Sequence, residues 1–336
     1  MTTQAVKPVT ITSLGQAVYP SFAMLAGMEL DVFTPLKDGP LSGAAVAAAI
    51  GVNPDRLGPL LYALVQAGLL QVEGERFANM PEAEQYLVRG KPTYIGSNHE
   101  LFTEMWRAAL GVSQSIRGDA PHARHDWGTM SDAELVTLLR GLHAGAVTNG
   151  RQFAESEKLE RFRHLLDVGG GSGGLAIAAC QACPDLRATV AELPRVAVIA
   201  TDFVAGSGVA DRVKILAADV NQQPPPGRYD VATFRHFFQV MSRDQARRAL
   251  VNVGQAIEPG GTIYIVGHVL EDSRLAPETA VGMNLVFLSV YDAGQSYTES
   301  EYRAWLEEAG FGEVEVRFGG GPGTVTVIVA RKQVGA

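Results

Sequence analysis

The sequence predicts an α/β fold in which a mostly parallel sheet, with an antiparallel hairpin at one edge, follows a helical N-terminal part. Three observations predict this fold. From residue 162 onward, short apolar segments alternate with helical ones, which is the pattern of βαβ units and a parallel sheet. The last two apolar segments flank a glycine-rich turn, as the strands of a hairpin do. Before residue 155, apolar residues recur at helical spacing instead.

Length, composition and charge limit the class of protein. A chain of 336 residues, 46% of them hydrophobic, can form two domains with sizeable cores. Its net charge is −8 and it contains no run rich in Lys and Arg, so we expect no nucleic-acid partner. The N-terminus lacks the layout of a signal peptide, and no apolar run approaches the roughly 20 residues of a membrane span. We therefore expect a protein of the cytoplasm with no membrane partner.

The first domain is expected to comprise residues 1–95. Within it, an Ala-rich helix, a turn at residues 51–54, an amphipathic helix and the β-turn-β segment QVEGERF follow one another, which is a winged-helix pattern. A helix that reads DNA needs basic residues facing the phosphates, yet residues 53–70 contain only Arg56, which Asp55 offsets. We therefore expect a packing module rather than a DNA reader.

The remainder is expected to form a helical bridge over residues 96–155 and an α/β domain over residues 156–336. The bridge has two helical segments, separated by the loop DAPHARHDWGTM with Trp127 in it. Within the α/β domain, five strands are expected in the segments HLLDVGG, RATVAEL, RVKILAAD, YDVATFRH and GTIYIVGH, the last directly after a Pro-Gly-Gly turn. The hairpin lies within residues 313–332.

Three local patterns are interpreted as structural. Ser242 is expected to cap a helix, and Thr298 with Glu301 to form a capping box at another. Cys180 and Cys183 form a CxxC, but the chain has no second pair of cysteines that would complete a zinc site. We therefore interpret both cysteines as packed residues.

A glycine-rich turn, DVGGGSGG, follows the first strand of the α/β domain and opens a helix. Such a turn alone is a weak signal, because it serves dinucleotides, nucleosides and close packing alike. Glu192 ends the second strand, where a carboxylate can accept hydrogen bonds from both ribose hydroxyls of a nucleoside. Asp219 ends the third strand and suits an adenine amino group, with Val220 as a wall for the ring. Together these residues predict a nucleoside-binding site.

This set resembles the S-adenosylmethionine-dependent methyltransferases with the Rossmann-like fold. With the winged-helix module before it, the whole chain resembles the plant-type and hydroxyneurosporene O-methyltransferases of small molecules. The resemblance implies a homodimer formed through an all-helical winged-helix dimerisation domain, and an aromatic or polyketide-like methyl acceptor. It also implies S-adenosylmethionine as the cofactor, held by Gly169, Gly171, Glu192, Leu193, Asp219, Val220 and Arg235, the last matching a family lysine near the sulfonium end of the donor.

Catalytic groups are expected beyond the carboxyl ends of the strands, where His236 follows the fourth strand and His268 the fifth. In the family that the chain resembles, the base is a histidine four residues after the position of Arg235, and here Gln239 stands in that place. An amide cannot accept a proton at any useful pH. Three explanations stay open. Another histidine is the base (His236, His268 or His143); the acceptor needs no base and Gln239 helps to hold it; or His236 and His268 bind a metal, for which we find no firm third ligand and which we therefore do not predict.

Acceptor-binding residues are expected after the fifth strand and in the bridge. Met283, Phe287 and Tyr291 recur at helical spacing after that strand, with Asn284 beside them, and the resemblance adds His143. The resemblance favours O-methylation, whereas Gln239 leaves methylation of carbon, nitrogen or sulfur open. Two alternative functions also stay open: a relative that binds S-adenosylmethionine but catalyses a rearrangement without methyl transfer, and a winged-helix regulator that senses S-adenosylmethionine.

Overall fold

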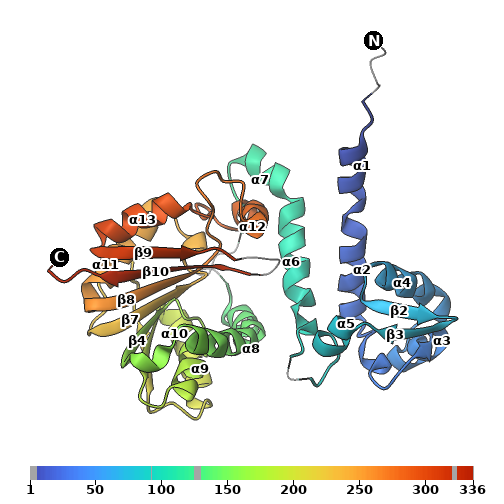
Figure 1. Ribbon diagram of the computed structural model, residues 1–336, viewed down its shortest axis with the longest axis horizontal. Helices are drawn as coiled ribbons and strands as arrows, with labels where there is room; N and C mark the ends of the chain where they lie inside the picture. Colours follow the sequence, from blue (N-terminus) through green and yellow to red (C-terminus); the bar gives the residue numbers. More distant parts are fainter. Residues whose placement is uncertain (1–5, 92, 125–129, 320–323, 336) are drawn as a thin grey trace. The chain divides into compact units, whose positions relative to one another are not determined.

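A computed structural model of the chain describes residues 6–91, 93–124, 130–319 and 324–335. Trp127 lies outside the described residues. The chain folds into two compact units, Met1–Arg107 and Ala108–Ala336 (Figure 1). Each unit has a hydrophobic core of its own, so each is a folding unit in the physical sense.

The N-terminal unit has the predicted winged-helix arrangement. Gly51, at φ 71°, ends one helix, and Asn53 caps the next by accepting a hydrogen bond from the backbone N–H of Asp55. Leu61 and Leu64 of that second helix are fully buried in the core of the unit. A three-stranded sheet of order β1-β3-β2 completes the unit. Its elements are α1 (Val9–Gln16), α2 (Val18–Glu29), η1 (Thr34–Leu36), β1 (Leu41–Ser42), α3 (Gly43–Ile50), α4 (Pro54–Gln66), β2 (Leu70–Glu73), β3 (Arg76–Asn79), α5 (Pro81–Tyr86) and η2 (Gly96–Asn98). Helix α6 (His99–Leu110) spans the boundary between the units.

The C-terminal unit contains a seven-stranded sheet of order β6-β5-β4-β7-β8-β10-β9. The first five strands in that order are parallel, whereas β10 runs antiparallel to both β8 and β9, which confirms the predicted edge hairpin. The strands are β4 (His164–Val168), β5 (Arg187–Glu192), β6 (Val213–Ala217), β7 (Tyr229–Arg235), β8 (Ile257–Gly267), β9 (Phe311–Arg317) and β10 (Thr326–Lys332).

Strand β8 begins earlier than the sequence predicts. The Pro-Gly-Gly segment lies inside the strand rather than before it, and Ile257 already pairs with Tyr229 of β7. The register then shifts between Tyr229 and Val231, and Gly260 adopts φ 81°. A glycine in this left-handed region lets an irregular strand continue, so the predicted turn forms an irregularity within the strand.

Helices cover both faces of the large sheet (Figure 1). Ser242 caps α11 (Arg243–Ala256), as predicted, and does so within a capping box that includes Gln245. Thr298 and Glu301 form the predicted capping box at α13 (Glu299–Glu308). Cys180 and Cys183 are buried in the core, as interpreted from the sequence. The helices of this unit are α7 (Val112–Gly118), α8 (Asp132–Ser156), η3 (Leu159–Arg161), α9 (Gly174–Ala182), α10 (Pro194–Ala205), η4 (Phe238–Val240), α11 (Arg243–Ala256), α12 (Glu278–Val290) and α13 (Glu299–Glu308).

The topology fixes where a ligand can bind. After β4 the chain builds β5 and β6 on one side, then returns to place β7 on the other side, so the strand order reverses between β4 and β7. Ligands of open α/β sheets bind beyond the carboxyl ends of the strands at such a switch point. The glycine-rich turn after β4 and the residues after β5, β6, β7 and β8 therefore meet at this edge.

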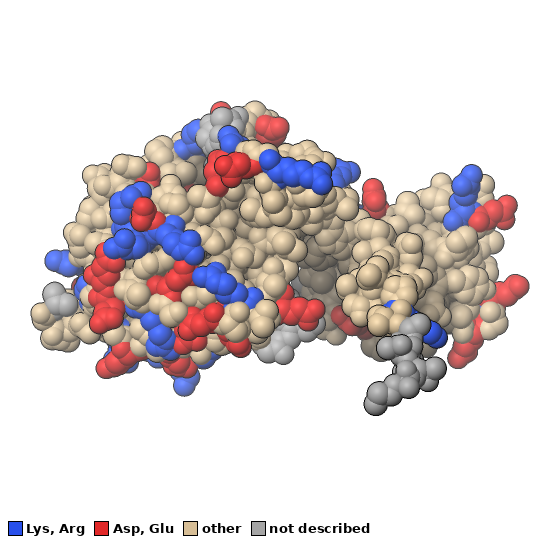
Figure 2. All heavy atoms as spheres, turned by 90° about the horizontal axis from the view of Figure 1, so that it is seen from above, with Lys and Arg blue, Asp and Glu red and all other residues tan. Residues whose placement is uncertain are grey.

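Basic and acidic side chains are interspersed on the C-terminal unit, on the face that Figure 2 shows, rather than gathered by sign. Within the described part of the chain, no helix combines the length and the hydropathy needed to cross a membrane.

Candidate active site

The glycine-rich turn has a backbone that few other residues could adopt. Gly169, Gly171 and Gly173 have φ values of 65°, 59° and 75°. Gly170 is required for space instead, because a Cβ atom there would lie 2.5 Å from Oδ2 of Asp167. The backbone N–H of Gly169 donates to the carbonyl of Ala191, which ties the turn to the end of β5. The turn therefore lies directly over the carboxyl ends of β4 and β5.

Glu192 connects β5 to this turn. Its Oε1 accepts a hydrogen bond from the backbone N–H of Gly171 at 2.9 Å, and its Oε2 accepts one from the N–H of Leu193 at 2.8 Å. Burial raises the pKa of Glu192 to about 7, although both hydrogen bonds oppose that rise. Leu193 itself is 43% exposed, so its predicted contact with the cofactor would be made at the rim of the site.

Asp167, near the end of β4, is a candidate site residue that the sequence analysis missed. The carboxyl group is 1% exposed, and its Oδ1 accepts a hydrogen bond from the hydroxyl of Thr233 at 3.0 Å. Its Oδ2 has no hydrogen-bond partner among the described residues. Burial raises the pKa of Asp167 to about 6, against the opposing effects of the Thr233 hydroxyl, of the positive charge on Arg235 and of the backbone N–H of Ala176. The available signal is an acidic residue two positions before the first glycine of the turn, but a single polar residue inside an apolar strand segment does not stand out.

Arg235 and Asp219 complete the set predicted for the cofactor. Burial lowers the pKa of the Arg235 guanidinium, whereas the negative charge on Asp167 raises it. Asp219 accepts a hydrogen bond from the backbone N–H of Asn221 at 2.9 Å, so it also shapes its own turn. Val220 is 4% exposed and packs in the core of the unit beside this turn.

These residues fit S-adenosylmethionine, whose groups are ribose hydroxyls, an adenine, an ammonium, a carboxylate and a sulfonium. The buried Oδ2 of Asp167 lacks a donor, and an ammonium group would supply one. Glu192 offers carboxylate oxygens to ribose hydroxyls, and Arg235 offers a guanidinium to a carboxylate. The glycine-rich turn leaves room for a ligand to approach the backbone closely.

Two histidines lie beyond β7 and β8, with their ring centroids 5.4 Å apart. His236 adopts φ 51°, which turns the chain sharply at the end of β7, and its ring forms a hydrogen bond with the side chain of Gln239. Burial, the charge on Arg235 and the neighbouring His268 lower the pKa of His236 to about 3. Burial also lowers the pKa of His268. Both rings are therefore neutral near pH 7, and Gln239 is a hydrogen-bond partner of His236.

The predicted acceptor residues divide into two groups. Phe287 on α12 lies 5.7 Å from the ring of His268 and 5.9 Å from the ring of Tyr291, so these three rings form one continuous cluster. Asn284 accepts a hydrogen bond from the backbone N–H of Ser296 at 2.8 Å and thereby holds the following loop. Met283, on the same helix, is half-buried.

His143 lies elsewhere. Its Nδ1 is 2.8 Å from Oγ of Ser172 in the glycine-rich turn, and its ring stacks on Phe203 at 4.4 Å. Thus the structure brings His143 to the turn rather than into the ring cluster formed by His268, Phe287 and Tyr291.

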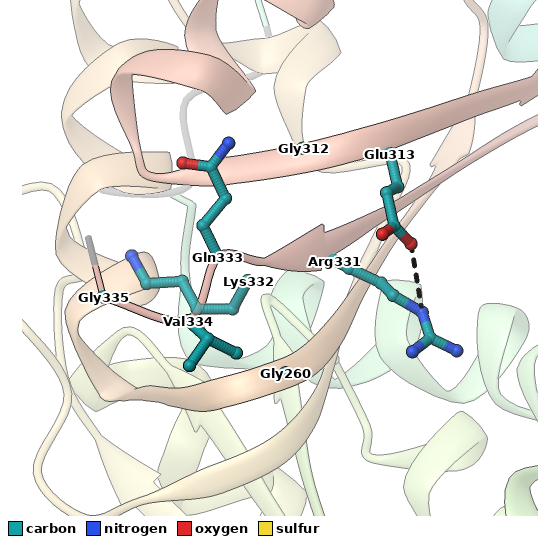
Figure 3. A pocket seen from close by; sticks show the side chains of 8 residues that line it. All are labelled: Gly260, Gly312, Glu313, Arg331, Lys332, Gln333, Val334 and Gly335. Carbon is teal, nitrogen blue, oxygen red and sulfur yellow. Dashed lines mark ion pairs between the residues drawn. The ribbon is translucent and has the colours of Figure 1, made fainter.

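A hollow of about 520 Å³ lies at the opposite end of the sheet, where β8 begins and β10 ends. Figure 3 shows Glu313 and Arg331 turned toward each other across its wall, with their charged atoms 3.7 Å apart. Lys332 donates to the carbonyl of Ala309. Because these groups already have partners and lie away from the carboxyl ends of the parallel strands, the hollow is not part of the candidate active site.

No cluster of three or more His, Cys, Asp or Glu side chains is arranged to hold a metal ion within residues 6–91, 93–124, 130–319 and 324–335. Among the residues that the structure describes, His236 and His268 thus have no third side chain of these types placed to complete a metal site.

Fold and site together define a Rossmann-like methyltransferase that uses S-adenosylmethionine, and comparison with known proteins identifies its family. A model of the O-methyltransferase domain matches residues 99–312, and a model of the O-methyltransferase dimerisation domain matches residues 13–89. The chain therefore belongs to the O-methyltransferase family, and its N-terminal unit contains the dimerisation domain of that family. The comparisons do not support a rearrangement enzyme or a regulator.

Similar proteins include biosynthetic enzymes and a mammalian one. The chain is 29% identical over 331 residues to 3-hydroxy-5-methyl-1-naphthoate 3-O-methyltransferase of Streptomyces sahachiroi, covering 97% of this chain and 95% of that one. It is 30% identical over 342 residues to acetylserotonin O-methyltransferase of Mus musculus, covering 93% and 86%. The N,N-dimethyltransferase OxyT of Streptomyces rimosus is 26% identical over 328 residues, covering 93% and 94%.

Solved structures show the same fold. Human N-acetylserotonin methyltransferase in complex with S-adenosylmethionine superimposes with a TM-score of 0.81, at 22% identity, over 99% of this chain and 100% of that one. An O-methyltransferase-like protein from Nostoc punctiforme gives a TM-score of 0.84 at 21% identity, over 98% and 100%. The roles assigned above to single residues stay predictions.

Proposed function

We propose that this enzyme methylates a hydroxyl group of a small aromatic or polyketide-like acceptor that binds beyond the carboxyl ends of β7 and β8. The observation that carries the proposal is the neutral pair His236 and His268, which stands at those strand ends and adjoins the aromatic cluster of Phe287 and Tyr291. Apolar rings with a few convergent polar groups are typical of sites for small aromatic molecules. The named substrate of the Streptomyces sahachiroi relative, a hydroxynaphthoate, supports this class of acceptor.

S-adenosylmethionine, when bound, supplies the electrophilic methyl group. The chain has to hold the acceptor oxygen in line with that group and remove its proton. A phenol has a pKa of about 10, so a base assists the reaction near pH 7.

We propose His268 as this base. Gln239 cannot take a proton, and a pKa of about 3 makes His236 a weak one, since general bases work best with a pKa near the working pH. His268 faces Phe287 from the end of β8, so its ring adjoins the proposed acceptor site. His236, held by Gln239, would orient the acceptor through a hydrogen bond.

Replacing His268 by alanine is expected to lower kcat/KM for 3-hydroxy-5-methyl-1-naphthoate by about 100-fold or more, the usual contribution of a general base. The change should leave the affinity for S-adenosylhomocysteine intact, because His268 has no part in the donor site. His236→Ala should cause a smaller loss. Since burial lowers the pKa of His268, the acid limb of the wild-type kcat/KM profile should lie below pH 6.5.

His164 is the matched control for this measurement, because it lies exposed at the other end of β4. His164→Ala should retain the wild-type rate. Full activity of His268→Ala would rule out His268 as the base. A product whose methyl group is on carbon or nitrogen, identified by mass spectrometry and NMR, would contradict O-methylation.

We also propose a homodimer formed through the N-terminal unit. Helix α1 has no buried residue, and its apolar side chains Val9, Ile11 and Leu14 are 64%, 76% and 68% exposed. Helix α1 leads into the residues that match the dimerisation domain, 13–89, and exposed apolar surface of this extent there favours a partner copy. Light scattering should give twice the mass of the chain, and Ile11→Asp with Leu14→Asp should shift it to the monomer. A monomeric wild-type enzyme at micromolar concentration would disprove the proposal.

A further inference from the structure

The glycine-rich turn is tethered through one side chain. Residues 169–174 are GGGSGG, so Ser172 has the only side chain in the segment. Ser172 is 3% exposed, and its Oγ lies 2.8 Å from Nδ1 of His143 on α8. The turn is otherwise held through its backbone, for example by the N–H of Gly171 on Glu192. His143 therefore links α8 to this turn by a hydrogen bond between side chains.

The His143 ring is itself held in place. It stacks on Phe203 of α10, with ring centroids 4.4 Å apart and planes 27° apart. Burial lowers its pKa, so the ring is neutral near pH 7 and keeps one nitrogen as a donor and the other as an acceptor. The imidazole ring and the Ser172 hydroxyl can therefore form a hydrogen bond with either group as the donor.

Helix α8 offers a rigid support for this contact, because it packs against the start of α9 without spare room. A Cβ atom at Gly174 would lie 2.7 Å from Cβ of Ala146, and one at Gly150 would lie 2.7 Å from Cα of Leu175. Ala146 is one turn of helix beyond His143. Because this contact is close-packed, α8 and α9 cannot move relative to each other without a steric clash. His143 thus holds Ser172 from a helix that cannot shift freely against the turn.

We propose that His143 is a positioning residue for the donor site, which orders the glycine-rich turn through Ser172. This inference rests on the donor site described above and replaces an acceptor-binding role for His143. Glycine has more conformational freedom to lose than any other residue, so a turn of five glycines around one serine is costly to order when a ligand binds. A tether that orders the turn in advance lowers that cost and raises donor affinity.

Three variants separate the hydrogen bond from the stacking of the ring. Ser172→Ala and His143→Phe remove the hydrogen bond, and His143→Phe keeps an aromatic ring on Phe203. His143→Asn keeps a polar group near the position of Nδ1 and loses the ring. We expect Ser172→Ala and His143→Phe to raise the dissociation constant of S-adenosylhomocysteine about fivefold in calorimetry, the effect of one ordinary hydrogen bond. His143→Asn should retain most of the wild-type affinity.

Two further results are expected if the two residues act as a unit. The double variant, His143→Phe with Ser172→Ala, should bind S-adenosylhomocysteine no more weakly than either single variant, because the effects of coupled residues do not add. The KM for 3-hydroxy-5-methyl-1-naphthoate, measured at saturating donor, should stay unchanged. Thr148→Ala on the same helix is the control, since the Thr148 hydroxyl donates only to the Ala144 carbonyl of its own helix and the residue is exposed.

Wild-type affinity in both Ser172→Ala and His143→Phe would overturn the proposal. So would a change in the acceptor KM with unchanged donor affinity, which would place His143 in the acceptor pocket after all. Failure of the wild-type chain to bind S-adenosylhomocysteine is a different result, because it would contradict the donor site itself. The melting temperature of each variant shows whether a loss of affinity follows from unfolding.

Discussion

Gly170→Ala is expected to weaken binding of S-adenosylhomocysteine by about 5- to 150-fold. The added Cβ atom would lie 2.5 Å from Oδ2 and 2.8 Å from Cγ of Asp167, and 2.9 Å from Cγ1 of Val190. Asp167 is buried at the end of β4 and cannot swing out of the way, so the turn has to move. Overpacking of this kind costs about 1–3 kcal/mol. The displaced turn would also lose the alignment of Gly171 with Glu192.

The loss should appear in calorimetry as a raised dissociation constant, with the melting temperature measured in parallel. Gly145→Ala is the matched control, because Gly145 lies in α8 and a Cβ atom there would meet nothing within 4 Å. Alanine is a better helix former than glycine by about 1 kcal/mol, so this control should be slightly stabilised and should bind normally. Wild-type affinity in Gly170→Ala would show that the turn is not the donor site.

Much of the fold could be predicted because its signals are local. The alternation of apolar strands with helices, the capping box at Thr298 and the glycine-rich turn each occupy a few neighbouring residues. The start of β8 could not be predicted in the same way. Pro-Gly-Gly usually marks a turn, but pairing of Ile257 with Tyr229 extends the strand past it, and that pairing joins residues distant in sequence.

The site residues that could be predicted from the sequence are those at or directly after the carboxyl end of a predicted strand. Glu192, Arg235, His236 and His268 were selected by this rule, and the structure places each at a carboxyl end of the sheet. The rule says nothing about contacts between elements. It could not show that Gln239 bonds to His236, or that His143 reaches Ser172.

Asp167 shows the limit most clearly. In the sequence, Asp167 is a single polar residue within an apolar strand segment. Only the three-dimensional structure shows that its Oδ2 is buried without a hydrogen-bond partner among the described residues, and that its charge acts on Glu192. Two carboxyl groups under one turn then raise each other's cost of ionisation. The pH dependence of the donor site follows from this pair.

Donor affinity is expected to fall about tenfold as the pH is lowered from 7 to 6. Burial raises the pKa of Glu192 to about 7 and that of Asp167 to about 6, so Glu192 becomes protonated across this range. Ribose hydroxyls and an ammonium group interact better with ionised carboxylates, so binding lowers both pKa values and releases protons. A single proton released on binding changes the dissociation constant tenfold per pH unit.

Calorimetry of S-adenosylhomocysteine binding in buffers with different ionisation enthalpies would count these protons directly. Glu192→Gln should bind more weakly above pH 7, because an amide cannot accept both backbone hydrogen bonds. It should approach the wild-type affinity as Glu192 becomes protonated at lower pH, and so lose most of the slope between pH 6 and 7. Asp167→Asn should keep that slope and lose the steeper part below pH 6. A dissociation constant that is constant from pH 5.5 to 8, with no proton release, would refute the assignment of both carboxyl groups to the donor site.

The stability of the ligand-free enzyme should change with pH in the opposite direction. Because both folded pKa values lie above those of unfolded carboxyl groups, about 4, the folded chain binds more protons than the unfolded one between about pH 4 and pH 7. Stability from these two groups is therefore greatest at low pH and is lost as the pH rises through 6 and 7. The ionisation of these two carboxyl groups should lower the melting temperature of the ligand-free enzyme by several degrees between pH 5 and pH 7.5. Asp167→Asn should reduce this decrease. The increase in melting temperature caused by S-adenosylhomocysteine should grow over the same range, because the carboxylates whose ionisation destabilises the empty site are the groups that bind the donor.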